Sequence, residues 1–200
     1  MKLLLTSSGL DSQSVVRAFV TALPETPQAC SVILFALIGD EVKQASVDEA
    51  VQELREIGVN DIIIFNLANE HFVSTARYDV TYVYGGNTFA ILERMRATGA
   101  DVFVGEAVRA GSLYVGVSAG SIMAGPDIEL AGWGSSGDPN NIHLKDLTSF
   151  GFTDLLIWPH YRPELHEEIE AFPRRSQVKI IEIADGEAVF VEGSRHQLIR

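Results

Sequence analysis

The chain has 200 residues, 46% of them hydrophobic, and its formal net charge at pH 7 is −12. A chain of this length can bury one substantial core, which predicts a single globular domain over residues 1–200. The acidic balance argues against nucleic acids and anionic membrane surfaces as partners, since phosphate groups are bound through Lys and Arg. The lone cysteine, Cys30, can form no internal disulfide, and no leader segment or membrane-length apolar run is visible. We therefore expect a cytoplasmic protein.

Strand-like and helix-like stretches alternate through the first 125 residues. The first, "KLLL", is a short apolar run that ends in the turn cluster "TSSG". The later stretches predict strands at 31–39, 61–67, 79–86 and 112–117 and helices at 11–23, 45–59 and 87–100. Because these strands are continuous apolar runs rather than alternating ones, they predict a parallel sheet with helices covering both faces.

The pattern changes after Gly125. A polar, glycine-rich loop, "GWGSSGDPNN", precedes a strand-like run at 154–161 and a short acidic helix at 163–172. The stretches "VKIIEI" and "EAVFVEGSRHQLIR" then predict strands, the last two of which form a hairpin across "EGSR". The sequence as a whole therefore predicts an α/β fold: a three-layer, doubly wound, mostly parallel sheet with a C-terminal antiparallel hairpin.

The stretch "LYVGVSAGSIMAG", residues 113–125, places Ser118 between a strand and a helix. Its centre matches G-x-S-x-G, the nucleophile elbow, in which the serine stands on a sharp turn at the carboxyl end of a strand. Gly116 and Gly120 would leave room for the crowded backbone. The next helix directs its positive end at the serine, and the Ala119 N–H would be one oxyanion donor. The alternative is an incidental serine in a glycine-rich connection.

A second strand-to-turn junction lies at "YVYGGNTF", residues 82–89. Gly85 and Gly86 allow a positive φ and a close approach of backbone to ligand, and Asn87 can cap the helix that follows. A free N–H at Gly86 could face the serine from a neighbouring strand end. We therefore expect both glycine junctions to border one pocket.

A serine nucleophile needs a base, and the base needs an orienting acid. His160 is the favoured base, because it ends the apolar run "LLIWPH" and so lies at the end of a strand. The other histidines lie in polar or exposed segments: His71, His143, His166 and His196. For the acid, the residues leave three candidates open: Asp185, Glu187 and Asp138.

These motifs together resemble the peptidase E family, the aspartyl dipeptidases, with cyanophycinase as a relative. The segments that carry the resemblance are "LLLTSSG", "YVYGGNTF", "GVSAGSIMAGPDIE" and "WPHY". The resemblance implies the fold of class I glutamine amidotransferases and a serine hydrolase acting on small peptides. It implies Ser118 as nucleophile, His160 as base, and N–H groups of Gly86 and Ala119 as oxyanion donors. The cyanophycinase-like members imply Asp185 as the third member.

Two departures from the family bear on chemistry and specificity. The related amidotransferases carry cysteine where this chain has Ser118, which disfavours glutamine amidotransfer. The aspartyl-specific members carry an arginine-rich segment after the histidine, whereas the matching segment here, 161–175, is largely acidic. Arg162 could still line the pocket, and Arg162 and Asn87 are the expected substrate-binding residues. Strict preference for N-terminal aspartate is therefore not expected.

The sequence as a whole predicts a serine-type peptidase that hydrolyses short peptides, dipeptidase-like, as a monomer or homodimer. No metal-ligand spacing, dinucleotide fingerprint or P-loop is present, so no metal and no cofactor are expected. Two alternatives remain: an esterase or amidase acting on a non-peptide small molecule, and a non-catalytic binding module that keeps the pocket of the fold.

Overall fold

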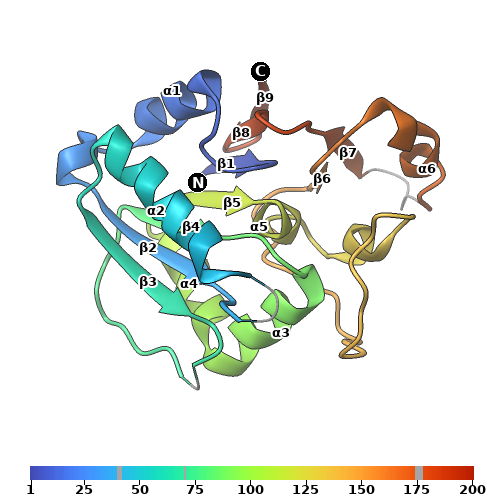
Figure 1. Ribbon diagram of the computed structural model, residues 1–200, viewed down its shortest axis with the longest axis horizontal. Helices are drawn as coiled ribbons and strands as arrows, with labels where there is room; N and C mark the ends of the chain where they lie inside the picture. Colours follow the sequence, from blue (N-terminus) through green and yellow to red (C-terminus); the bar gives the residue numbers. More distant parts are fainter. Residues whose placement is uncertain (40–41, 70, 174–177) are drawn as a thin grey trace.

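The computed structural model describes residues 1–39, 42–69, 71–173 and 178–200 (Figure 1). A seven-stranded sheet in the order β3-β2-β4-β5-β1-β8-β9 forms its centre. The first five strands of that order run parallel, and β8 and β9 are antiparallel to their neighbours. The strands of this sheet are β1 (Lys2–Thr6), β2 (Ser31–Ala36), β3 (Asp61–Asn66), β4 (Val80–Val83), β5 (Leu113–Val117), β8 (Ala188–Glu192) and β9 (Arg195–Ile199).

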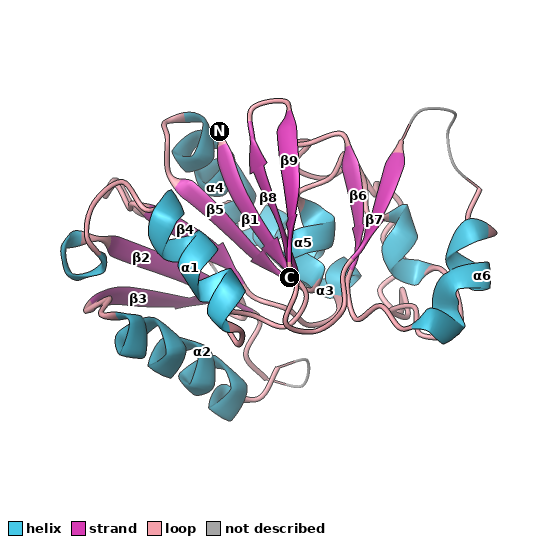
Figure 2. Cartoon of the chain, turned by 90° about the horizontal axis from the view of Figure 1, so that it is seen from above, coloured by secondary structure: helices cyan, strands magenta, loops and turns pink. Residues whose placement is uncertain are grey.

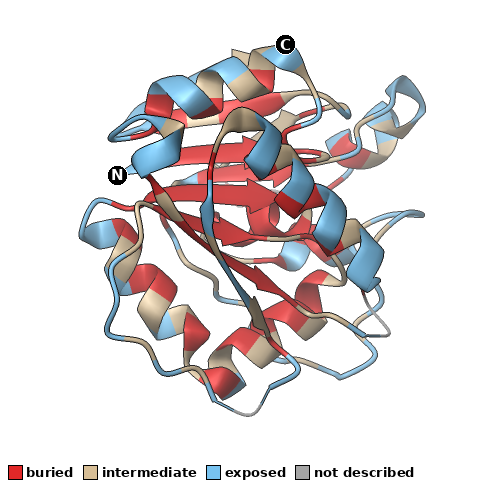
Figure 3. Cartoon of the chain, turned by 60° about the vertical axis from the view of Figure 1, so that its left-hand side comes forward, coloured by how far each residue is buried: buried red, intermediate tan, exposed pale blue. Residues whose placement is uncertain are grey.

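Helices cover both faces of this sheet, with the buried strands between them (Figure 3). On one face α1 (Gln13–Ala22) and α2 (Gln44–Ile57) pack on alternate residues of the strands, such as Leu4 and Leu34. On the other face α3 (Thr88–Thr98), α4 (Ala100–Arg109) and α5 (Ala119–Met123) pack on Leu3, Leu5 and their neighbours. The predicted fold class, a doubly wound α/β sheet with an antiparallel C-terminal hairpin, is therefore confirmed.

The local signals in the sequence mark the helix ends. The Ser12 hydroxyl accepts a hydrogen bond from Val15 N–H and caps α1, and the Asn87 side chain does the same for α3. Gly58 ends α2 in the left-handed conformation, with φ of 107°. Helix α4 has no counterpart among the expected elements, because Gly99 both ends α3 and precedes α4, with no polar cap to mark the new start.

A second, smaller sheet lies beside β9, at the edge of the large sheet (Figure 2). There β6 (Leu155–Trp158) and β7 (Lys179–Glu182) pair in parallel as a separate two-stranded sheet. These strands pack with α6 (His166–Glu170) around a small apolar cluster that includes Trp158 and Ile169. Short 3-10 turns lie at Pro27–Ala29, Glu129–Gly132 and Pro163–Leu165.

The edge strand β3 departs from the expected pattern. Its run "DIIIFN" predicts burial on both faces, yet Ile63 and Ile64 are 47% and 39% exposed. The reason lies in the connection that follows, 67–79, which contains no helix in its described part to cover this strand. Across the described ranges, no helix combines the length and apolar character that a bilayer crossing requires.

Candidate active site

Ser118 stands at the turn between β5 and α5. Its backbone has φ of 50° and ψ of −108°, a strained conformation for a residue with a side chain. Gly116 and Gly120, on either side of Ser118, are required because the turn leaves no room for a side chain at either position. A Cβ on Gly116 would lie 2.6 Å from the backbone of Gly120, and one on Gly120 would lie 2.2 Å from the Val83 carbonyl oxygen. The sequence "GVSAG" therefore forms a tight, strained strand-to-helix turn, which is the backbone geometry that a nucleophile elbow requires.

Buried hydrogen bonds hold this turn from below. The Ser121 hydroxyl lies 2.8 Å from the carbonyl oxygens of both Thr6 and Gly116. The Tyr114 hydroxyl donates to the Gly120 carbonyl at 2.7 Å, and Ser118 N–H donates to the Thr6 carbonyl at 3.0 Å. Because these groups are bonded away from water, the strained turn is fixed from the sheet side.

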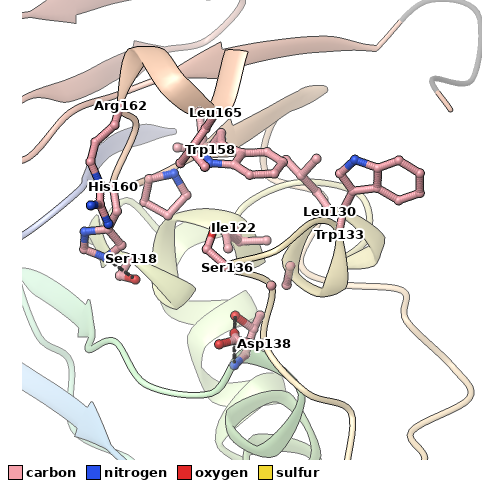
Figure 4. Close-up of a pocket in the computed structure, with 15 residues that line it drawn as sticks. Ser118, Ile122, Leu130, Trp133, Ser136, Asp138, Trp158, His160, Arg162 and Leu165 are labelled. Carbon is pink, nitrogen blue, oxygen red and sulfur yellow. Dashed lines mark hydrogen bonds between the residues drawn. The ribbon is translucent and has the colours of Figure 1, made fainter. Parts of the chain in front are cut away.

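The structure brings Ser118, His160 and Asp185 together from three separate segments. Nε2 of His160 lies 2.9 Å from Oγ of Ser118, and Nδ1 lies 2.6 Å from Oδ1 of Asp185. Figure 4 shows the imidazole directly above the serine. His160 follows β6 with φ of 55°, and Asp185 lies in the turn between β7 and β8. A carboxylate, an imidazole and a hydroxyl thus form one hydrogen-bonded series.

The surroundings of Asp185 favour its charged form. Partial burial by itself raises the pKa of Asp185. Hydrogen bonds from Ser7 and His160, together with the nearby charges of His160 and Arg162, outweigh it and hold the pKa below the ordinary aspartate value. Asp185 is therefore suited to carry a negative charge beside the imidazole.

The two other candidate acids lie elsewhere. Glu187 accepts a hydrogen bond from Ala184 N–H and pairs with Arg200 at 3.0 Å. Asp138 accepts two hydrogen bonds from Thr88, at 2.8 Å from the N–H and 2.6 Å from the hydroxyl. Both carboxylates thus have partners other than His160.

The expected oxyanion donors lie near Ser118. Ala119 is the first residue of α5, so its N–H has no acceptor within that helix. The junction after β4 packs against the serine, since a Cβ on Gly85 would lie 3.2 Å from Cβ of Ser118. Gly86 has φ of 133°, and a Cβ there would lie 2.9 Å from Val42. Strands β4 and β5 are neighbours, so both glycine junctions meet at one edge of the sheet.

A cavity of about 280 Å³ opens beside Ser118 and His160 (Figure 4). Much of its lining is apolar or aromatic: Ile122, Leu130, Ala131, Trp133, Ile157, Trp158, Pro159 and Leu165. Asp138 lies across the cavity from this apolar wall, while Arg162 extends beside the imidazole.

The predicted substrate-binding residues differ in their placement. Arg162 lines the cavity. Asn87 is engaged elsewhere: its amide oxygen caps α3, and its amide nitrogen donates to the Pro139 carbonyl at 2.9 Å. Substrate binding by Asn87 therefore stays a prediction. Residues 174 and 175, which close the segment compared with the aspartyl-specific members, lie outside the described residues.

Sequence reasoning missed several residues around the site. Trp133 has no assigned role in the sequence analysis, yet it borders the cavity and donates from Nε1 to the Glu168 carbonyl at 2.9 Å. Ser7 was read as part of a turn cluster, yet its hydroxyl contacts both His160 and Asp185. A usable signal existed for Ser7, because "TSSG" follows a parallel strand and so lies at the ligand-binding edge of the sheet. In the described part of the chain, no three His, Cys, Asp or Glu side chains group as metal ligands.

Comparison with known proteins agrees with this fold. A doubly wound α/β sheet with a serine at a strand-to-helix elbow, hydrogen-bonded to a histidine, defines the class of α/β proteins built like serine hydrolases. Within that class, the chain belongs to peptidase family S51, whose sequence model matches residues 3–199.

The relatives are bacterial peptidases. An uncharacterized peptidase of Listeria innocua is 31% identical over 72% of both chains, and a peptidase E of Salmonella newport is 30% identical over 66% of this chain. An uncharacterized Listeria monocytogenes peptidase is 33% identical over 58% of this chain. The aligned stretches span only 57% of that Listeria monocytogenes protein and 55% of the Salmonella one.

Solved structures agree over nearly the whole chain. The crystal structure of a putative peptidase E from Listeria monocytogenes superposes with a TM-score of 0.82 at 25% identity, covering 100% of this chain and 98% of that one. A peptidase from an acI-B1 actinobacterium superposes with a TM-score of 0.70 at 13% identity, covering 99% and 86%, which indicates a shared fold.

Proposed function

We propose that the chain is a serine peptidase that hydrolyses short peptides. Ser118 is the nucleophile, His160 the general base and Asp185 the orienting acid. The observation that carries the proposal is the series of two short contacts, 2.9 Å from Nε2 to the serine oxygen and 2.6 Å from Nδ1 to the carboxylate. Membership of peptidase family S51 supports the same chemistry.

In the first half of the reaction, His160 Nε2 takes the Ser118 proton as Oγ attacks the scissile carbonyl carbon. The carbonyl oxygen becomes an oxyanion and accepts hydrogen bonds from the Gly86 and Ala119 N–H groups, where losing one donor typically costs about 100- to 1,000-fold in rate. Asp185 accepts from Nδ1–H, which keeps Nε2 free as the base and stabilises the imidazolium.

In the second half, the imidazolium donates its proton to the leaving amine as the C–N bond breaks. An acyl-enzyme on Ser118 remains. Water then attacks that ester while His160 takes its proton, and return of the proton to Oγ releases the acid product and restores the enzyme.

The cavity supports a small, mainly apolar substrate group. Its volume of about 280 Å³ is just below the roughly 300–1,000 Å³ of typical ligand sites. Leu130, Trp133 and Trp158 favour an aliphatic or aromatic side chain next to the scissile bond. Arg162, beside the imidazole at the rim, can pair with a side-chain carboxylate of a short peptide. We therefore propose dipeptides with an apolar residue, rather than N-terminal aspartate alone, as substrates.

The proposal is tested by labelling with a fluorophosphonate probe and by a panel of dipeptides. We expect the wild type to be labelled at Ser118 and to hydrolyse some members of the panel, and the Ser118→Ala variant to do neither. Ser121→Ala is not a suitable control, because that hydroxyl holds the elbow. Ser136→Ala is a better one, since Ser136 lines the cavity without touching His160 in the described structure. Equal hydrolysis of the dipeptides by wild type and Ser118→Ala would refute the proposal that the chain is a serine peptidase with Ser118 as nucleophile.

The alternatives give different results in the same experiment. Labelling with hydrolysis of p-nitrophenyl acetate but of no peptide would indicate an esterase or amidase on another substrate. Absence of labelling would indicate a non-catalytic binding module. A cytoplasmic location is also proposed, supported by the buried, unpaired thiol of Cys30. The oligomeric state, monomer or homodimer, is to be measured by sedimentation.

A further inference from the structure

The geometry of the site depends on a residue to which the sequence motifs assign no role, the serine that follows β1. Ser7 is fully buried, with an exposed fraction of 0%. Its hydroxyl lies 2.7 Å from His160 N and 2.8 Å from Oδ1 of Asp185. A hydroxyl has one proton to give, and a backbone N–H can only donate. Ser7 therefore accepts from the His160 N–H and donates to Asp185.

From this geometry we infer that Ser7 is a positioning residue that fixes His160 and Asp185 relative to one another and to Ser118. The inference rests on the proposed function. Ser7 touches no substrate, since it is buried and does not line the cavity beside Ser118. It acts only through the two side chains that do the chemistry.

The sheet order gives the physical basis. Strand β1 lies between β5, which leads into Ser118, and β8, which follows Asp185. At the end of β1 the Thr6 carbonyl accepts from Ser118 N–H at 3.0 Å, and Ser7 N–H donates to the Glu187 carbonyl at 3.1 Å. The backbone of Thr6 and Ser7 is thus hydrogen-bonded to the turn of Ser118 on one side and to the turn that contains Asp185 on the other.

The contact to His160 matters because that residue is strained. Its φ of 55° lies in the left-handed region, which costs free energy for a residue with a side chain. Two N–H groups of this segment donate hydrogen bonds that hold it there: His160 N–H to the Ser7 hydroxyl, and Tyr161 N–H to the Ile183 carbonyl at 3.0 Å. Without the Ser7 hydroxyl the first is lost.

The contact to Asp185 fixes which nitrogen of His160 is free. Ser7 Oγ and His160 Nδ1 approach the same oxygen, Oδ1, and lie 3.5 Å from each other. Two donors on one oxygen hold the carboxylate in a fixed position against the imidazole. Nδ1 then keeps its proton, and Nε2 faces Ser118 as an acceptor.

The neighbouring serine provides a matched control. Ser8 Oγ accepts from Gly186 N–H at 2.9 Å, so it holds the same turn but touches neither His160 nor the Asp185 carboxylate. Ser7→Ala and Ser8→Ala each remove one hydroxyl from the same loop. Only the first removes a contact to the proposed catalytic side chains.

The experiment measures the rate constant of fluorophosphonate labelling and, with a dipeptide substrate, kcat and KM. We expect Ser7→Ala to lower the labelling rate and kcat about 10- to 100-fold, by analogy with the loss of a hydrogen-bond partner that orients a metal-bound histidine. KM should stay within about twofold, because the cavity is untouched, and Ser8→Ala should stay within about threefold of wild type on all measures. Equal losses in the two variants, or a Ser7→Ala loss confined to KM, would overturn the inference.

A double variant separates positioning from general loss of structure. In an Asp185→Ala background the Ser7 hydroxyl has lost its acceptor, so Ser7→Ala should then cost less than it does in the wild type. Full additivity would overturn a role through Asp185. If Ser7→Ala does not fold, Ser7→Cys replaces it: the thiol is a weak donor of similar shape, and labelling at the wild-type rate would equally overturn the inference. If the wild type itself is not labelled, the proposed function has failed instead.

Discussion

Ser118 and His160 meet through their side chains, and both have a strained backbone. Their φ angles are 50° and 55°, and in the described ranges His143 is the one further non-glycine residue with a positive φ. Such strain costs about 1–3 kcal/mol per residue and tends to gather at functional sites. Here each strained residue follows the end of a strand, β5 or β6, and turns its side chain toward the other. The contact between two residues with strained backbones supports the proposed roles of Ser118 as nucleophile and His160 as base, independently of the family match.

The first prediction separates the three candidate acids. Asp185→Asn should lower kcat/KM by up to about 10,000-fold, because the imidazole loses the group that fixes its tautomer. Glu187→Gln and Asp138→Asn should keep activity within a few-fold. Each of these two should lower the free energy of unfolding by about 1 kcal/mol, since each weakens hydrogen bonds of its own carboxylate. Labelling rates and thermal unfolding of the three variants provide the check.

A loss of labelling in Asp138→Asn as large as that in Asp185→Asn would contradict this assignment. It would make Asp138, in the loop after α5, the acid that orients His160. The 2.6 Å contact between His160 Nδ1 and Asp185 Oδ1 would then have no catalytic role.

The second prediction concerns pH and stability. The pKa of Asp185 is lower in the folded chain than in a free aspartate, so its contribution to stability is complete above the ordinary pKa of about 3.9 and disappears as pH falls through the lowered value. The Tm difference between wild type and Asp185→Asn should therefore shrink between pH 5 and pH 2. It should be no more than about 3 °C at pH 6, because an exposed pair contributes roughly 1 kcal/mol or less. A difference that grows toward low pH would show the opposite shift.

The third prediction concerns the elbow glycines. Gly120→Ala places a Cβ 2.2 Å from the carbonyl oxygen of Val83 and 3.0 Å from its carbonyl carbon, both of which are backbone atoms of β4. We expect a loss of about 1–3 kcal/mol in the free energy of unfolding, together with much slower labelling of Ser118. Gly105→Ala is the matched control, because the atoms nearest to its Cβ, from 3.3 Å, are at the flexible end of the Arg109 side chain in the same helix. That variant should gain roughly 0.5–1 kcal/mol and keep full activity.

Denaturant unfolding and probe labelling of both glycine variants give the comparison. A Gly120→Ala protein as stable and as reactive as wild type would mean that the elbow can relax without moving the serine.

The sequence predicts the large sheet and the elbow for a local reason. Each parallel strand is a short apolar run with its own turn signal, and "GVSAG" carries both the serine and the glycines that its turn needs. The pairing of β6 with β7 in a separate sheet is not local, because the two strands are divided by α6 and a loop. The contacts of Ser7 are less local still, since they join residues more than 150 positions apart. Periodicity says which face a residue occupies but not which distant turn it meets.

The exposure of the edge strand β3 is a second feature that the sequence does not predict. "DIIIFN" reads as a strand buried on both faces, and nothing within it indicates that the next connection lacks a helix. Whether a strand is covered depends on the segment that follows it, which explains why Ile63 is buried in the expectation and 47% exposed in the structure.

The fourth prediction tests the proposed substrate with two variants and two kinds of dipeptide. Trp133 contributes to the apolar wall of the cavity, and Arg162 lies at its rim beside His160. Trp133→Ala should raise KM for dipeptides with a leucine or phenylalanine side chain by about 10-fold or more, because that side chain loses apolar contact. Arg162→Gln should leave those substrates within about threefold and lower kcat/KM selectively for dipeptides with an aspartate. Steady-state kinetics on matched Leu, Phe and Asp dipeptides decide the matter: a wild type that strongly prefers aspartate, and loses all hydrolysis with Arg162→Gln, would reassign the pocket to acidic substrates.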